Sequence, residues 1–385
     1  MITADNVALF QTEFANPLRD LLYHDPQIPY DAGKALSLRA RFLEHCPDAV
    51  EMLSSSDVED DDLALMLHLL TDEAFCADPY PVPATAAETL EEKKYALLLR
   101  EYIHSLLQEM SVRFASGDVF DVYQANVASA PSFQTQIPVW ICWWQGEEQM
   151  PEVVRMCVHS IRHALSGHPV EIHFITEQNY GRYVAFPQRI LSLFRAGNIT
   201  ITHLTDLLRA ELLSRYGGLY IDATYLVRGE LPPEWFLPET FYTIRHKEPQ
   251  PQYVSQGKWS QNLLKMPAGE PLARFLRNAF YLYWSEQEQL ADYFLIDIII
   301  EEASRSVPQI RERLSAVPPS MPYMEILVHN LNEAYDPATE SVLTANTCVF
   351  KLSRKLPFHK ETPDGRETLY GHLYREYENA EQHYD

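Results

Sequence analysis

The chain has 385 residues, of which 46% are hydrophobic and 12% aromatic, so it is longer than one ordinary domain and has ample apolar material for a packed core. Its formal charge of -23 at pH 7 argues against nucleic acid as a partner, and against an anionic membrane surface approached without a local basic patch. The 5 cysteines are scattered and show no C-x-x-C spacing, which predicts reduced thiols in a cytoplasmic protein and no zinc site.

The sequence predicts neither a targeting signal nor a membrane span. The first residues, MITADNVALFQTEF, lack the basic and apolar regions of a signal peptide. No apolar run approaches the length of a transmembrane helix. We therefore expect a cytoplasmic protein without a transmembrane segment, whose contact with a membrane, if any, is peripheral docking on a membrane-bound pathway.

The first third of the chain reads as helical. Residues 85–88 (TAAE) form a capping box, and apolar residues at helical spacing follow between positions 99 and 114. The acidic run at 57–62 resembles a metal site in composition, but clustered acids before an apolar helix are more typical of a solvated first turn that suits the helix dipole. We expect a helical N-terminal domain over residues 1–130.

A linker and a change of pattern mark the second domain. Residues 125–136 are small, polar and without periodicity. From residue 137 the chain alternates strand and helix: 137–144 (IPVWICWW) reads as a buried strand, a helix begins after Pro151, and 170–176 (VEIHFIT) reads as a second strand. Strand, helix, strand implies a parallel unit with ligands beyond the carboxyl ends of its strands.

Two residues near those strand ends are candidates for binding a nucleotide. Trp144 closes the first strand, and an aromatic ring there can stack on a nucleobase, although it can equally be a core aromatic. Asn179 follows the second strand and can hydrogen-bond a base or a ribose, although asparagine is also a common turn residue.

The most informative stretch is 205–226 (TDLLRAELLSRYGGLYIDATYL). It predicts a helix that ends at Gly217 and turns directly into a buried strand. Asp206 and Arg209 lie three residues apart and share one helix face. Asp222 falls in the apolar strand, where an unpaired carboxylate would cost several kcal/mol. A metal ion, a sugar hydroxyl or the guanidinium of Arg209 would each compensate it.

The order S/T-D-x-x-R, short apolar helix, Y-G-G and aromatic-x-D resembles the donor-site segment of DXD-type glycosyltransferases with a GT-A fold. The likeness is closest to the capsular polysaccharide synthesis protein family and related mannosyltransferase-like enzymes, and it extends over roughly residues 134–355. It implies an α/β fold of the GT-A type, a Rossmann-like mixed sheet flanked by helices, over residues 131–385. One departure concerns the metal, because Thr224 stands where many relatives have the second Asp.

The resemblance assigns roles to residues of this stretch. Asp206 and Arg209 would hold sugar hydroxyls, with Arg209 also near the diphosphate, and Tyr220 would belong to the donor-binding set. Asp222 would contact the ribose, the donor sugar and a divalent cation, Mn²⁺ or Mg²⁺. A neutral hydroxyl at Thr224 is a weak ligand, so such a cation would be held less tightly or replaced by basic residues.

Two later blocks resemble the same family. Residues 292–297 (DYFLID) are similar to a Y-F-L-x-H/D element, which implies that Asp297 contacts the acceptor or the sugar; alternatively it pairs with a core arginine or a backbone amide. The tail CVFKLSRKL is similar to a K-L-T/S-x-K element, which implies that Lys351 stabilises the diphosphate leaving group. A solvated surface lysine is the alternative.

These features together predict a glycosyltransferase of the hexosyltransferase type, with Asp222, Arg209 and Asp297 as its catalytic residues. It would move a sugar from a nucleotide-sugar donor to a glycan or lipid-linked glycan during capsular or surface polysaccharide synthesis, and the resemblance implies retention of anomeric configuration. Two alternatives stay open. One is a pseudoenzyme that binds nucleotide sugar or glycan without turnover, and the other is a toxin-like transferase that acts on protein.

Overall fold

The computed structural model describes residues 136–381 apart from 249, 251 and 252, together with residues 31–45, 105–110 and a few positions around them. Backbone contacts divide the chain into two compact units, one formed by residues 1–106, 250–256 and 291–298 and the other by the rest. The first unit contains α3 (Ala32–His45).

Most of the features predicted for the N-terminal part cannot be compared with the structure. The capping box at 85–88, the acidic run at 57–62 and nearly all of the linker at 125–136 lie outside the described residues. Residues 105–110 are helical, within the apolar stripe predicted as a helix. The boundary expected near residue 130 stays a prediction.

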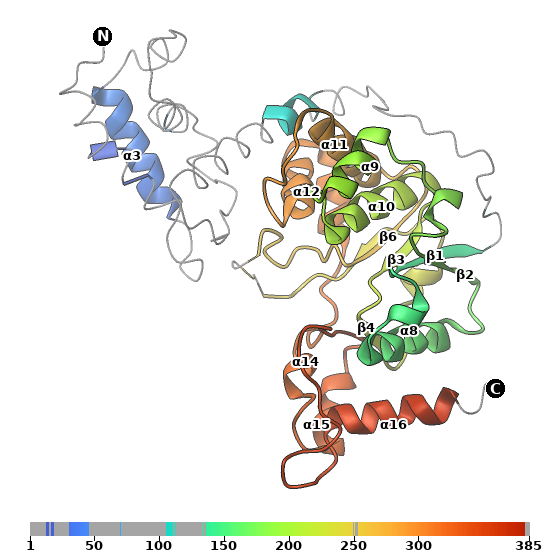
Figure 1. Ribbon diagram of the computed structural model, residues 1–385. Helices are drawn as coiled ribbons and strands as arrows, with labels where there is room; N and C mark the ends of the chain where they lie inside the picture. The colour runs from blue at the N-terminus through green and yellow to red at the C-terminus, as the bar shows by residue number, and fades with distance from the viewer. Residues whose placement is uncertain are drawn as a thin grey trace. The chain divides into compact units, whose positions relative to one another are not determined.

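The second unit is built on a mixed sheet of five strands in the order β2-β1-β3-β6-β5 (Figure 1). Its strands are β1 (Ile137–Cys142), β2 (Val170–Ile175), β3 (Gly218–Ile221), β5 (Tyr242–Thr243) and β6 (Leu263–Met266). The strands β2, β1 and β3 are parallel, whereas β6 runs antiparallel to both β3 and β5. The prediction of a mixed sheet in an α/β fold is confirmed.

Helices cover both sides of this sheet. On one side α8 (Glu152–Leu165) connects β1 to β2, and on the other α9 (Gln188–Ala196), α10 (Ile201–Tyr216) and α11 (Pro271–Glu286) lie together (Figure 1). Because α10 lies between the sheet and α11, it is buried nearly all round, including several of its charged side chains. None of the helices in the described part of the chain has both the length and the apolar character needed to cross a membrane.

A second, two-stranded sheet brings the C-terminal part of the chain beside the main sheet. It pairs β4 (Tyr225–Val227) antiparallel with β7 (Val349–Lys351). Helices α15 (Pro337–Thr344) and α16 (Leu369–Glu381) lie near it (Figure 1). The remaining helices are α12 (Leu295–Ser306), α13 (Pro308–Ala316) and α14 (Leu327–Asn330), with short 3-10 turns at Glu147–Gln149, Tyr180–Arg182 and Pro233–Phe236.

The junction between α10 and β3 has no loop. Helix α10 ends at Tyr216 and β3 begins at Gly218, so the predicted helix-to-strand turn is confirmed. Gly217 and Gly218 have φ values of 65° and 96°, which residues with a Cβ rarely adopt. A Cβ on Gly218 would lie 2.1 Å from the carbonyl oxygen of Pro138 on β1. The backbone of β1 therefore approaches the junction too closely for any other residue.

Lys265 on β6 is a buried lysine whose ammonium group donates hydrogen bonds to the carbonyl oxygens of Pro238 (3.1 Å) and Thr240 (3.4 Å). Burial lowers the pKa of Lys265 to about 8, against a smaller opposing effect of Glu239. Because the unfolded chain keeps this proton up to a higher pH than the folded chain, this lysine makes folding more favourable as pH rises above 8.

We therefore predict a pH-dependent difference between the wild type and Lys265→Met. The free energy of unfolding of the wild type, minus that of the variant, is expected to rise between pH 8 and 10 by up to about 1.4 kcal/mol per pH unit. Urea denaturation of both proteins at three pH values across this window measures the difference. A constant difference would contradict a lowered pKa.

Candidate functional site

Asp222 lies at the centre of the candidate site, at the carboxyl end of β3. The run predicted as one strand is interrupted here: β3 ends at Ile221, and the amide of Tyr225 donates a hydrogen bond to the carbonyl oxygen of Asp222, which closes a turn before β4. The expectation that Asp222 lies inside a strand is therefore wrong by one residue. The turn leaves its side chain 23% exposed, so a ligand can reach it.

Two cations from distant parts of the sequence contact the carboxylate of Asp222. Its Oδ1 lies 3.4 Å from Nη2 of Arg209, and its Oδ2 accepts a hydrogen bond from Nζ of Lys351. Arg209 comes from α10, and Lys351 is placed by the register of β7, where it lies opposite Tyr225 of β4. The structure thus brings together three of the predicted site residues, and arginine and lysine compensate the buried part of the carboxylate.

Several side chains contact Arg209, although its buried Nε has no hydrogen-bond partner among the described residues. Its Nη1 lies 3.1 Å from Oδ1 of Asp206 and also donates to Oε1 of Gln261, while its guanidinium carbon lies 4.4 Å from the ring centre of Tyr220. Burial alone lowers the pKa of Arg209, but Tyr220 and the carboxylates of Asp206 and Asp222 outweigh it and raise the pKa overall. With only 3% of the side chain exposed, Arg209 is a fixed positive charge at the base of the site.

Lys351 is more accessible than Arg209, with 25% of its side chain exposed. Its Nζ lies 5.0 Å from the ring centre of Tyr225, a cation-π contact that supports the ammonium group from below. The hydroxyl of Tyr225 lies 3.3 Å from Oγ of Ser260, and burial raises the pKa of this tyrosine, so the ring stays neutral. Lys351 can therefore exchange partners without losing its place.

Two contacts of the site were not predicted from the sequence. Gln261 reaches Arg209 because β6 pairs with β3, and the carbonyl oxygen of the next residue, Asn262, accepts a hydrogen bond from the amide of Asp222. Tyr225 lies within the conspicuous stretch that contains Asp222, but only the pairing of β4 with β7 places it under Lys351.

The two tryptophans after β1 differ in their surroundings. Trp144 is buried, and its ring contacts Tyr180 (5.0 Å between ring centres) and Phe194 (5.7 Å). Trp143 is half-buried, its Nε1 has no hydrogen-bond partner among the described residues, and the guanidinium of Arg354 lies 5.7 Å from its ring centre. Base stacking by Trp144 stays a prediction, and the unpaired Nε1 of Trp143 is itself buried from solvent.

Asn179 and Asp297 also have defined surroundings. The side-chain amide of Asn179 donates to the carbonyl oxygen of Phe174 (2.7 Å) and accepts from the amide of Thr176 (2.8 Å), so both of its ends are used within its own loop. Asp297 is buried in the first turn of α12 and belongs to the compact unit that contains residues 291–298. The predicted contacts of both residues with substrate stay predictions.

Among the side chains around Asp222 that could coordinate a metal, the site provides one carboxylate for a divalent cation. Both of its oxygens face cations, and the carbonyl oxygen of Thr224 accepts a hydrogen bond from the amide of Leu352 (2.9 Å). No group of three or more histidine, cysteine, aspartate or glutamate side chains that could hold a metal occurs within the described ranges. A metal held by protein side chains alone does not fit these residues, and a metal shared with a bound diphosphate stays a prediction.

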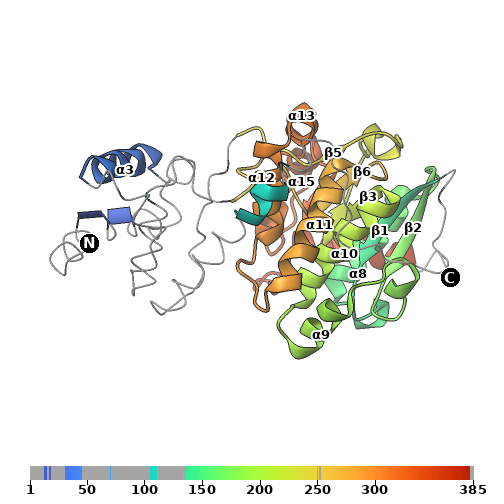
Figure 2. The ribbon, with the colours of Figure 1, turned by 90° about the horizontal axis from the view of Figure 1, so that it is seen from above.

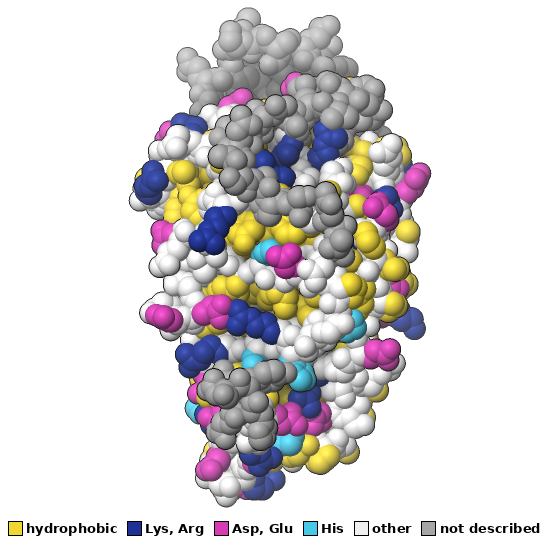
Figure 3. Space-filling model, turned by 90° about the vertical axis from the view of Figure 1, so that its right-hand side faces the viewer, with side chains coloured by type: hydrophobic (Ala, Val, Ile, Leu, Met, Phe, Trp, Pro, Cys, Tyr) yellow, Lys and Arg dark blue, Asp and Glu magenta, His cyan; other side chains and the backbone are white. Residues whose placement is uncertain are grey.

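Positive charge is scarce on this chain. Figure 3 shows one face of the molecule, on which lysine and arginine side chains lie singly or in small groups among acidic and apolar ones. Arg209 and Lys351 balance the carboxylates of Asp206 and Asp222, so this part of the site is neutral although the whole chain has a formal charge of -23. Such a place suits an anionic ligand, which the negative electrostatic potential of the rest of the chain would repel.

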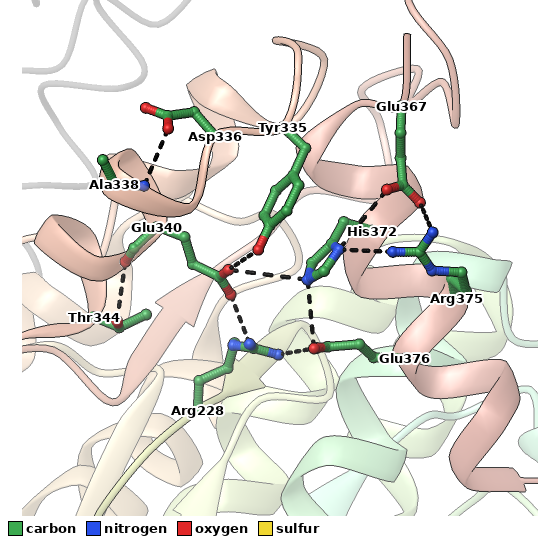
Figure 4. A network of polar contacts seen from close by, with 10 residues as sticks. All are labelled: Arg228, Tyr335, Asp336, Ala338, Glu340, Thr344, Glu367, His372, Arg375 and Glu376. Carbon is green, nitrogen blue, oxygen red and sulfur yellow. Dashed lines mark hydrogen bonds and ion pairs between the residues drawn. The ribbon is translucent and has the colours of Figure 1, made fainter.

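A cavity of about 880 Å³ lies between α8, β4, α15 and α16, away from these residues along β4. Its charged groups are paired with one another (Figure 4): Arg228 lies 2.6 Å from both Glu340 and Glu376, and His372 lies 3.4 Å from Glu376. Arg228 thus lies between two carboxylates, as Arg209 does, but no lysine is among the described residues that line this cavity. The cavity is less suited to a diphosphate than the site at Asp222.

Comparisons with known proteins agree with the resemblance in the sequence. The model of the family described as "Capsular polysaccharide synthesis protein" matches residues 113–373, more than half of the chain and all of the residues that surround Asp222. No curated protein matches the chain. Among solved structures, one titled "PaToxG Glycosyltransferase" is similar with a TM-score of 0.29 and 10% identity, over 67% of this chain and 96% of that chain; so low a score carries no argument. By its family match, the chain belongs to the capsular polysaccharide synthesis protein family.

Proposed function

We propose that this protein is a glycosyltransferase that moves a sugar from a nucleotide-sugar donor to a hydroxyl group of a glycan or lipid-linked glycan in surface polysaccharide assembly. The observation that carries the proposal is the convergence of Arg209, Asp222 and Lys351 at the carboxyl end of β3. The family of the chain supports the pathway. The donor's nucleotide, the hexosyl type and retention of configuration are finer parts of the same proposal.

The charges of the site suit the departure of a nucleoside diphosphate. In the transfer, the bond between the anomeric carbon and the diphosphate oxygen breaks and its electron pair stays on the diphosphate, the acceptor oxygen bonds to that carbon, and the hydroxyl proton passes to the departing diphosphate. Negative charge grows on the diphosphate, where Lys351 and Arg209 would stabilise it without having to be assembled first. Asp222 would accept hydrogen bonds from hydroxyl groups of the donor, and Asp206 would keep Arg209 in place.

Lys351 has to change partners in this scheme. Its Nζ donates a hydrogen bond to Asp222 in the structure, and a bound diphosphate would offer it a second, more strongly charged partner. Asp222 would then be released toward the hydroxyl groups of the donor. A divalent cation shared between Asp222 and the phosphates would add further positive charge to the same place.

Donor binding tests the proposal directly. We expect at least one member of a panel of UDP-, GDP- and CMP-sugars, with and without Mn²⁺, to raise the melting temperature of the protein, because a ligand that binds only the folded state stabilises it. Lys351→Met is expected to weaken the binding of that donor about tenfold or more, since it removes a hydrogen bond between charged groups.

Lys360→Met is the matched control. Like Lys351, Lys360 pairs with a carboxylate, that of Glu152 (3.4 Å), and lies over a tyrosine ring, that of Tyr374 (3.4 Å from its centre). It lies elsewhere in the fold. This variant should bind the donor as the wild type does. A melting temperature of the wild type that no nucleotide sugar changes would count against the proposal. Binding without hydrolysis or transfer would favour a pseudoenzyme. That alternative is suggested by the neutral Thr224, which stands where many relatives have the second Asp.

A further inference from the structure

A line of buried polar side chains leads from α11 to Arg209. Figures 1 and 2 show α10 and α11 side by side, and Trp284 of α11 donates a hydrogen bond from its Nε1 to Nε2 of His203 on α10 (2.8 Å). Nδ1 of His203 faces Oδ2 of Asp206 at 3.7 Å, and Oδ1 of Asp206 lies 3.1 Å from Arg209. The side chains of His203, Asp206 and Arg209 are at most 7% exposed.

The hydrogen bond from Trp284 fixes the tautomer of His203. An indole N–H can only donate, so Nε2 of the histidine has to accept, and the proton of the neutral ring is on Nδ1. That proton points toward Asp206. The distance of 3.7 Å is longer than a hydrogen bond, and Nδ1 has no hydrogen-bond partner among the described residues. The N–H dipole therefore acts on the carboxylate electrostatically, and such effects are strong in a low-dielectric interior.

The consequence is a fixed orientation of the arginine. One oxygen of Asp206 faces the N–H of His203 and the other holds Nη1 of Arg209, which leaves Nη2 of the same guanidinium directed at Asp222. Without the N–H group, this oxygen of Asp206 would lose the dipole that faces it, and the carboxylate could rotate and take the guanidinium with it.

We propose that His203 and Trp284 are positioning residues of the donor site: they set the orientation of Asp206 and, through it, of the arginine that faces Asp222. This inference rests on the proposed function, because it concerns the arginine assigned to the diphosphate. It adds two residues that no sequence motif indicated, one of them on a helix that does not itself reach the carboxylate at the centre of the site.

The tautomer can be measured without any substrate. In the protein labelled with ¹⁵N-histidine, the two ring nitrogens of His203 are expected to show protonation at Nδ1 and not at Nε2, with the signals assigned by their loss in His203→Asn. Trp284→Phe removes the donor and should produce a mixture of tautomers or a shift toward Nε2. A wild-type His203 protonated at Nε2 would overturn the inference.

Kinetics of donor hydrolysis provide the functional test. Trp284→Phe and His203→Leu are expected to lower kcat about tenfold, the scale of loss when a partner of a site residue is removed, while KM changes less than about twofold. His203→Asn should recover much of the loss, because its side-chain amide can occupy the place of Nδ1 and donate to Asp206.

Phe280→Leu is the structural control. Phe280 packs edge-to-face on His203 (5.3 Å between ring centres) but has no polar atom, so its replacement should lower the melting temperature and leave kcat unchanged. A Trp284→Phe enzyme with wild-type kcat, or a loss of kcat as large in Phe280→Leu, would refute the positioning role. A wild-type protein that binds and hydrolyses no donor would instead refute the proposed function, and the tautomer measurement would still decide whether the line of contacts exists.

Discussion

Asp222→Asn is expected to lower kcat/KM for donor hydrolysis at least about a hundredfold, the scale of loss when one charge-stabilising group of an active site is removed. The change keeps the shape of the side chain and removes its charge. Arg209 and Lys351 then lose the anion between them, and their mutual repulsion would disturb the positions in which both receive the diphosphate. Steady-state assays of nucleotide release measure the effect.

The control for this variant is Asp364→Asn. Asp364 is also a carboxylate paired with an arginine, Arg366 (2.8 Å), but it is 60% exposed and lies in a surface turn. Its replacement should leave kcat/KM within about twofold, because exposed ion pairs contribute little even to stability. If Asp222→Asn kept wild-type activity while it folded normally, the carboxylate would have no part in catalysis and the proposed site would be wrong.

Gly218→Ala is expected to have the largest effect on stability, a loss of more than about 3 kcal/mol in the free energy of unfolding or failure to accumulate as soluble protein. The new methyl group would lie 2.1 Å from the carbonyl oxygen of Pro138, and the alanine would also have to adopt a φ of 96°. Neither strand can retreat, because β1 is held by its pairing with both β2 and β3. Urea denaturation of the purified variant measures the loss.

Gly229→Ala separates the two causes. Gly229 has a similar φ of 86°, but a Cβ there would meet no atom within 4 Å. Its replacement therefore adds only the conformational strain, about 1 to 2 kcal/mol. Equal losses in the two variants would show that the close approach of β1 is unimportant.

The local features of the central segment could be predicted from the sequence because they depend on neighbouring residues. The helix that ends at Gly217 and the strand that follows show a change of periodicity and two glycines. The pairing of Arg209 with Asp222 was one of three partners predicted for the carboxylate, and the structure shows this pairing together with a lysine. The turn at Asp222 was not foreseen, since the run from 219 to 227 contains no glycine or proline to mark it.

The contacts that complete the site depend on pairings between distant segments. Lys351 reaches Asp222 through strands of three residues, which are too short to show a pattern. His203 and Trp284 lie on different helices, and a histidine within a helix does not reveal which partner its ring has. Asn179 shows the opposite case, because a residue suited to bind a ligand makes one donated and one accepted hydrogen bond with the backbone within five residues of its own position.

Because β4 pairs with β7, the three charged side chains of the site, Arg209, Asp222 and Lys351, come together only late in the synthesis of the chain. A nascent chain that has emerged only as far as Ala345 contains the arginine and the carboxylate but not Lys351. Until β7 is made and pairs with β4, this cation is missing, so on the proposed function a polypeptide that ends before Lys351 would lack one of the two cations that face the diphosphate.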